Sequence, residues 1–127
     1  MEGVLVDTSV WVAHFRQRSE TLVSLLHLDL ALTHPMVLLE LACGTPPAPR
    51  ERTLRNVGSL RKTQQAAAHE VVELIERERL YGLGCGLVDV SLLASVLMTP
   101  GAALWTLDKR LADLAARFGI LYQRSLN

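Results

Sequence analysis

Short apolar runs alternate with longer amphipathic segments along the chain. Residues 4–6, 30–33, 102–106 and 120–122 have the continuous apolar character of strands that are buried on both faces. Between these runs, apolar residues recur at helical spacing, which predicts helices over residues 10–16, 19–27, 36–43, 50–60, 66–79, 87–98 and 111–118. Short strands alternating with helices predict an α/β fold, with a short and mostly parallel central sheet flanked by helices.

Proline and glycine residues mark the boundaries of these elements. Pro35 stands in the first turn of an expected helix, and Gly44 follows the last turn of the same helix. The proline-rich segment 45–49 reads as a rigid connector, because too little chain lies on either side of it for a domain linker. A length of 127 residues predicts one domain, residues 1–127.

Composition and charge exclude several classes of protein. Half of the residues are apolar, which excludes a disordered chain, and two cysteines are too few for a disulfide-stapled scaffold. Thirteen basic and thirteen acidic residues cancel, so the total charge points to neither nucleic acid nor a membrane surface. The N-terminus has no signal-peptide pattern, and Pro100-Gly101 interrupts the longest uncharged run. We expect a cytoplasmic protein with no membrane association.

Four acidic residues stand in apolar surroundings. Asp7 ends the first strand, Asp108 follows the strand at 102–106, and Glu40 and Asp89 interrupt apolar helices. Each has an ordinary structural alternative, because Asp7, Asp89 and Asp108 can cap helices and Glu40 can pair with an arginine. Ligands in open α/β sheets bind outside the carboxyl ends of the strands, where all four carboxylates can meet.

Four carboxylates in one cleft require compensation. Two of them about 4 Å apart repel by ~4 kcal/mol at an effective dielectric constant near 20. A divalent cation is the simplest remedy, and Mg²⁺ or Mn²⁺ prefers oxygen ligands and keeps several waters for a substrate. Such a site predicts metal-dependent hydrolysis of phosphodiesters.

Four segments carry a resemblance to a known family. They are residues 6–11 (Val-Asp-Thr-Ser-Val-Trp), Glu40 before Gly44, residues 86–95 with Asp89, and residues 104–111 with Asp108. In this order, and at this chain length, the sequence resembles the PIN-domain ribonucleases. It is similar in particular to the VapC-type toxins of bacterial and archaeal toxin–antitoxin pairs.

The resemblance implies a fold, a site and an activity. The fold would be a PIN-like α/β/α sandwich, with a catalytic Mg²⁺ or Mn²⁺ pocket built from Asp7, Glu40, Asp89 and Asp108. Thr8, Ser9 and Thr106 would be polar neighbours that orient a carboxylate or a metal-bound water. Members of the family cleave RNA endonucleolytically, commonly a tRNA or an rRNA, and thereby inhibit translation. A cognate VapB-type antitoxin blocks the site, and a homodimer is expected.

Charge is distributed unevenly along the chain. Residues 1–48 sum to −3 and residues 63–127 to −1, whereas residues 49–62 sum to +4. A basic segment of this kind can contact phosphates, although a solvated helix face explains it equally well. The candidate RNA contacts are Arg50, Arg52, Arg55, Arg61 and Lys62.

Two other interpretations remain open at the level of sequence. The first is a catalytically silent PIN-like module that binds RNA or an antitoxin, and the presence of all four acids argues against it. The second is a phosphoacceptor receiver domain, which needs an adjacent acid pair after the first strand, whereas Thr8 follows Asp7. The apolar face of the first helices, with Val12, Phe15 and Leu22, fits a core, a dimer contact or an antitoxin groove.

Overall fold

Seven helices and three strands make up the part of the chain that the structure describes. This computed structural model describes residues 2–123, so Met1 and residues 124–127 of the predicted domain 1–127 lie outside it. The elements are β1 (Gly3–Val6), α1 (Thr8–Arg16), α2 (Glu20–His27), β2 (Ala31–Leu32), α3 (Pro35–Cys43), α4 (Arg50–Gly58), α5 (Ala68–Glu78), α6 (Leu87–Leu97), β3 (Ala102–Trp105) and α7 (Lys109–Arg117).

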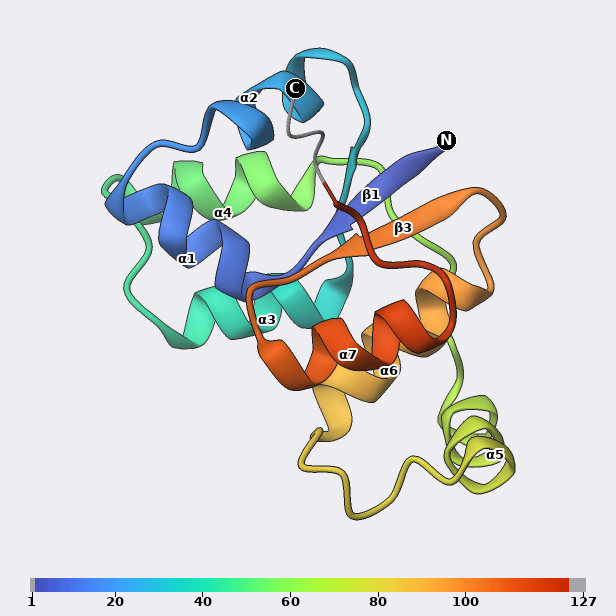
Figure 1. Ribbon diagram of the computed structural model, residues 1–127. Coiled ribbons are helices and arrows are strands. Elements are labelled where there is room, and N and C mark those ends of the chain that lie inside the picture. Colours follow the sequence, from blue (N-terminus) through green and yellow to red (C-terminus); the bar gives the residue numbers. More distant parts are fainter. Residues whose placement is uncertain (1, 124–127) are drawn as a thin grey trace.

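The sheet has the order β2-β1-β3, and both pairings are parallel. β1 is central, and Val4, Leu5 and Val6 within it are completely buried, as their continuous apolar run predicts. Because the three strands run in one direction, their carboxyl ends reach the same edge of the sheet, which is the edge where α1 and α7 begin (Figure 1). This edge carries the candidate site.

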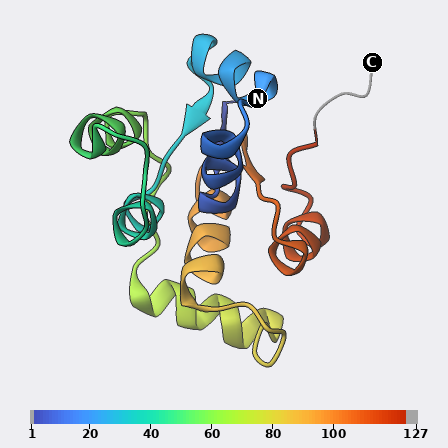
Figure 2. The same ribbon diagram turned by 90° about the vertical axis from the view of Figure 1, so that its left-hand side faces the viewer.

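Helices surround the sheet on both sides. In Figure 2, α3 and α4 lie to one side and α7 to the other, with α1 and α6 between them. α6 is buried along most of its length, from Val90 to Val96, which explains why this helix has almost no polar face. α5 packs against α6. The predicted α/β fold with a short parallel sheet is confirmed.

Three of the four predicted strands are shorter or absent in the structure, and β3 ends at Trp105, one residue before the predicted end. The segment 120–122 forms no strand, and only Leu121 makes a parallel bridge, to Leu104. After α7 and the turn at Gly119, few residues lie beside β3. Two backbone hydrogen bonds join this segment to β3: the Leu104 N–H donates to the Ile120 carbonyl, and the Tyr122 N–H donates to the Leu104 carbonyl. The strand predicted over 30–33 narrows to β2.

A glycine fixes the turn that brings β3 beside β1. Gly101 has a φ of +75°, and a Cβ atom there would lie 2.5 Å from Cγ of Glu2. The Glu2 N–H donates a 3.0 Å hydrogen bond to the Gly101 carbonyl, so the ladder between β1 and β3 starts at this turn. No helix among residues 2–123 is both long and apolar enough to span a bilayer.

Candidate functional site

The four predicted acids lie on elements that meet at the carboxyl edge of the sheet. Asp7 directly follows β1, and Asp108 lies just beyond β3, at the start of α7. Asp89 stands in the first turn of α6, and Glu40 in the second turn of α3. Residues distant in sequence therefore come to one side of the fold because parallel strands end there.

Asp7 is a buried carboxylate held by two hydroxyl groups. Its residue is 5% exposed, and its Oδ2 accepts hydrogen bonds of 2.7 Å from Ser9 Oγ and 2.7 Å from Thr106 Oγ1. Asp7 occupies the N-cap position of α1, but its side chain accepts no amide hydrogen bond from that helix. The ordinary helix-cap explanation is therefore wrong for this residue.

The two hydroxyls belong to a network that fixes their own orientation. Ser9 Oγ accepts the Leu107 N–H at 3.0 Å, and Thr106 Oγ1 accepts the Asp108 N–H at 3.0 Å. Because the backbone amides occupy lone pairs on both oxygens, the hydroxyl protons are directed toward Asp7. The start of α1 and the end of β3 are thereby joined through one buried carboxylate.

Asp108 and Glu40 have different surroundings from Asp7. Asp108 caps α7, since its Oδ1 accepts the Leu111 N–H at 3.1 Å, so the helix-cap alternative holds here. Glu40 is exposed, and its Oε1 accepts a 2.7 Å hydrogen bond from Thr8 Oγ1. No arginine pairs with Glu40 among residues 2–123, so the ion-pair alternative is wrong within the described chain.

Asp89 lies within the electrostatic field of the other three acids. Its pKa is raised, first by burial and then by the charges of Asp7 and Asp108, with a smaller contribution from Glu40. A hydrogen bond with the backbone of Gly86, the N-cap residue of α6, opposes part of this shift. Within residues 2–123, no lysine or arginine forms an ion pair with any of the four carboxylates. No ion pair within the described residues therefore neutralises these four carboxylates.

The donor chemistry fits a hard divalent cation, although the carboxylates are not gathered into a cage. No group of three His, Cys, Asp or Glu side chains in the described chain is placed to hold a metal ion as the side chains stand. The reason is visible in the hydrogen bonds, because Asp7, Glu40 and Asp108 are each turned toward another partner. All-oxygen ligands are what Mg²⁺ and Mn²⁺ prefer, and Glu40 and Asp108 are exposed to solvent.

Two of the predicted RNA contacts serve the ends of helices instead. The Arg50 guanidinium donates to the carbonyls of Ala42 and Gly44 at the carboxyl end of α3. Lys62 Nζ donates a 2.8 Å hydrogen bond to the Gly58 carbonyl at the end of α4. Basic side chains at these positions satisfy carbonyls that have no partner within the helix.

Of the other three predicted RNA contacts, one has partners within the protein and two have none among the described residues. Arg61 donates to the carbonyls of Glu2 and Asp29 and lies 3.6 Å from the Asp29 carboxylate. Arg52 and Arg55 on α4 are exposed and form no hydrogen bond or ion pair within residues 2–123. Arg52 and Arg55 are therefore the two predicted contacts whose side chains have no partner within the described residues.

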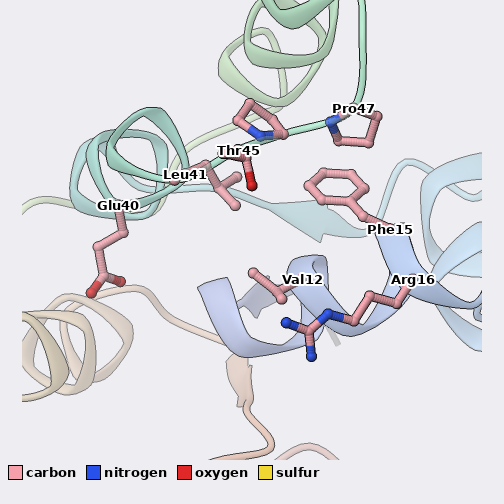
Figure 3. Close-up of a pocket in the computed structure, with 9 residues that line it drawn as sticks. Val12, Phe15, Arg16, Glu40, Leu41, Thr45 and Pro47 are labelled. Atoms are coloured by element: carbon pink, nitrogen blue, oxygen red, sulfur yellow. The ribbon is translucent and has the colours of Figure 1, made fainter.

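The structure also contains a hollow that the sequence interpretation missed. It has a volume of about 570 Å³ and lies between α1, the end of α3 and the connector that follows α3 (Figure 3). The residues lining this α1–connector hollow are Val12, Phe15, Arg16, Glu40, Leu41, Gly44, Thr45, Pro46 and Pro47. The spacing of Thr8, Val12 and Arg16, four residues apart, was the available signal, because it places them on one face of a helix.

Comparison with known proteins identifies similar sequences. The profile of the PIN domain matches residues 4–117, a span that includes all four acids. Over 117 residues the chain is 44% identical to a protein named Ribonuclease VapC32 from Mycobacterium tuberculosis (strain CDC 1551 / Oshkosh), covering 92% of this chain and 94% of the relative. The protein of the same name from strain ATCC 25618 / H37Rv matches with the same identity and coverage.

Proposed function

The chain belongs to the PIN-domain family, as a VapC-type member, and from this premise we propose that it is a Mg²⁺- or Mn²⁺-dependent endoribonuclease. It would act as the toxin of a type II, VapBC-type toxin–antitoxin pair. The observation that carries the proposal is the proximity of Asp7, Glu40, Asp89 and Asp108 at the carboxyl edge of the sheet, where burial and then the charges of the other three acids raise the pKa of Asp89. A 44% identical relative carries the name ribonuclease, which supports RNA as the substrate.

Each acid has a role that follows from its surroundings. Asp7 is the fixed metal ligand, because burial and two hydroxyl donors hold its carboxylate in place. Glu40 and Asp108 are exposed and would supply further ligands, in place of their hydrogen bonds to Thr8 and to the α7 amide. When bound, Mg²⁺ or Mn²⁺ supplies Lewis-acid stabilisation of the charge on the phosphate and activates water.

Asp89 is the best placed of the four to act on the attacking water. It is partly buried, and the neighbouring carboxylates raise its pKa, so it accepts a proton more readily than an ordinary carboxylate. Asp7 and Asp89 together orient the water toward the scissile phosphate. The water loses its proton to the carboxylate, forms the new bond to phosphorus and breaks the bond to the leaving oxygen.

Partners follow from the surface around the acids. Leu39, Leu87 and Leu107 are 63%, 70% and 59% exposed, and each is close in sequence to one of the four acids. Large apolar side chains around a charged site are typical of a surface that a protein partner covers. We assign this rim to a cognate VapB-type antitoxin and to a second copy of the chain in a homodimer, with tRNA or rRNA as the substrate and inhibition of translation as the result.

Cleavage of RNA by the purified protein tests the proposal. With total RNA and Mn²⁺ we expect discrete fragments, which excess EDTA abolishes. Asp7→Asn and Asp89→Asn should each slow cleavage by at least about 100-fold while leaving the thermal unfolding transition in place. Asp113→Asn is the matched control, because Asp113 is an exposed aspartate of α7 that pairs with Lys109, outside the site.

Three outcomes would contradict the proposal. Full activity in EDTA would exclude a metal requirement, and undiminished activity of both asparagine variants would exclude the acid site. If the wild-type protein binds RNA but never cleaves it in Mn²⁺, the chain is a catalytically silent binding module.

A further inference from the structure

The α1–connector hollow lies beside the candidate site, because Glu40, one of the proposed metal ligands, also lines the hollow. We propose that it binds the nucleotide next to the scissile phosphate, with the base against the apolar wall and the adjoining phosphate at Arg16. This inference rests on the proposed ribonuclease function and names the part of the RNA that the site selects.

The size and lining of the hollow suit one nucleotide. Its volume of about 570 Å³ lies within the ~300–1,000 Å³ range that is usual for small-molecule pockets. Val12, Phe15 and Leu41 form much of an apolar wall, while Thr45 contributes a hydroxyl. A nucleobase has two apolar faces and a polar edge, which matches a lining of this kind.

The hollow is continuous with the acid site through Glu40. Glu40 lines the hollow and also accepts the hydrogen bond from Thr8, directly after Asp7. In Figure 3, Glu40 projects from α3 at one side and Arg16 from α1 at the other, with Val12 between them. The helical rise of 1.5 Å per residue places Arg16 about 12 Å along α1 from Thr8. An RNA strand that is cleaved at the acid site therefore places a neighbouring nucleotide at Arg16.

The charge of Arg16 favours a phosphate as its partner. Arg16 is exposed and forms no hydrogen bond or ion pair within residues 2–123, whereas nearby Arg18 is paired with Glu20 at 2.8 Å. A free guanidinium presents a planar set of donors that matches phosphate oxygens. The four acids repel the phosphates of RNA. The positive charge of Arg16, at the end of the hollow farther from Glu40, would attract a phosphate of the same strand and offset this repulsion.

Cleavage of a single-stranded RNA pool with randomised sequence tests this assignment in Mn²⁺. Sequencing of the cleaved ends should show that the wild-type protein prefers certain bases at one position beside the cut. Phe15→Leu should remove the preference at that position alone and lower kcat/KM about tenfold, because it removes the aromatic face and keeps an apolar side chain. Arg16→Gln should lower kcat/KM to a similar extent and flatten its dependence on salt.

Two kinds of control separate substrate binding from chemistry and folding. Affinity for Mn²⁺, measured by calorimetric titration, should be unchanged in both variants, since neither Phe15 nor Arg16 is one of the four acids. Phe118→Leu and Arg18→Gln remove the same side-chain types outside the hollow and should cleave as wild type. Arg16 is exposed, so its substitution tests the assignment even if Phe15→Leu unfolds the protein.

The possible failures are distinguishable. A wild-type protein that cleaves no RNA overturns the proposed function and this inference with it. A wild-type protein that cleaves RNA, with both variants retaining its rate and base preference, overturns this inference alone. Variants that cleave normally but lose affinity for an antitoxin peptide assign the hollow to a protein partner, which also overturns it.

Discussion

Asp7 and Asp108 each follow a strand, but their hydrogen bonds give the two carboxylates different roles. The Asp7 carboxylate accepts from the hydroxyls of Ser9 and Thr106, whereas the Asp108 carboxylate accepts a helix amide. Side-chain hydroxyls therefore hold the carboxylate of Asp7, whereas the same residue type in a similar sequence setting caps a helix at Asp108. Thr106 serves both, because its hydroxyl donates to Asp7 and accepts the Asp108 N–H.

Replacing Thr106 by valine tests this dual role. Valine keeps the shape but removes the donor to Asp7 and the acceptor for Asp108, so we expect a loss of ~1–2 kcal/mol in the free energy of unfolding. Affinity for Mn²⁺ should fall about 10- to 100-fold, as calorimetric titration would measure. Thr63→Val is the matched control, because the buried Thr63 hydroxyl has no hydrogen-bond partner among the described residues. Equal losses in the two variants would refute the role assigned to Thr106.

At the scale of elements, one histidine joins α3, α6 and the segment between α4 and α5. His34 caps α3, since its Nδ1 accepts the Met36 N–H at 3.0 Å, and its Nε2 lies 3.1 Å from Ser95 Oγ on α6. Ser95 Oγ also accepts the Ala66 N–H at 3.1 Å. Because Nδ1 is an acceptor, the neutral ring carries its proton on Nε2 and donates to Ser95.

This junction makes the stability of the fold depend on pH. Burial lowers the pKa of His34 below its ordinary value of 6.5, so the unfolded chain binds a proton first as the pH falls. Stability is therefore present above pH 6.5 and is lost as the pH decreases below it. We expect His34→Asn to be ~1–2 kcal/mol less stable at pH 7.5 and to lose less than wild type on acidification to pH 5.5.

Urea denaturation at the two pH values measures this difference. His69→Asn, at an exposed position, should keep the wild-type dependence. His14 contributes to the dependence of stability on pH that remains in the His34 variant, because burial and the charge of Arg18 lower the pKa of His14 as well. A His34 variant whose stability falls as steeply as that of the wild type would contradict the assignment.

The elements were predictable to the extent that local pattern determines them. The apolar run of β1 and the mostly apolar sequence of α6 can be recognised from sequence, because burial on most sides leaves few polar positions. The segment 120–122 carries the same signal, yet it has room for only one bridge beside Leu104. Whether an apolar run becomes a strand depends on the space that its neighbours leave, which the run itself does not encode.

The site was predictable in composition and only partly in geometry. Parallel strands imply that Asp7 and Asp108 share an edge, and this follows from sequence order alone. The partner of Asp7, Thr106, is 99 residues away, so the hydrogen bond between them could not be derived from local sequence. The hollow that Val12 and Arg16 line could not be derived for a similar reason, because residues 44–47 of the connector and Leu41 of α3 complete it.

For the whole molecule, a net charge of zero conceals an acid edge and a set of arginines with unequal roles. Arg50 and Arg61 are bound to backbone carbonyls, whereas Arg52 and Arg55 are free within the described chain. Neutralising a phosphate releases counterions, so a free arginine that contacts RNA contributes to the salt dependence of binding. An arginine that holds carbonyls contributes to folding instead.

Single glutamine substitutions separate the two groups. Arg52→Gln and Arg55→Gln should each reduce the slope of log Kd against log salt concentration by about 0.7, the value for one contact to single-stranded RNA. Arg50→Gln should leave the slope unchanged and lower the free energy of unfolding by ~1 kcal/mol. Fluorescence anisotropy of labelled RNA in a potassium chloride series and urea denaturation give the two measurements. If the slopes of all three variants equal the slope of the wild type, α4 does not contact RNA.

The pairing of β1 with β3 has a consequence for biosynthesis. Gly3 lies opposite Ala102, so the central strand cannot complete its ladder until the ribosome has made most of the chain. Asp7 likewise acquires its Thr106 donor only after four-fifths of the 127 residues are synthesised. A prematurely terminated nascent chain therefore holds no assembled acid edge. For an enzyme that would cut the RNA of the translation machinery, this connectivity postpones activity until its own messenger has been read.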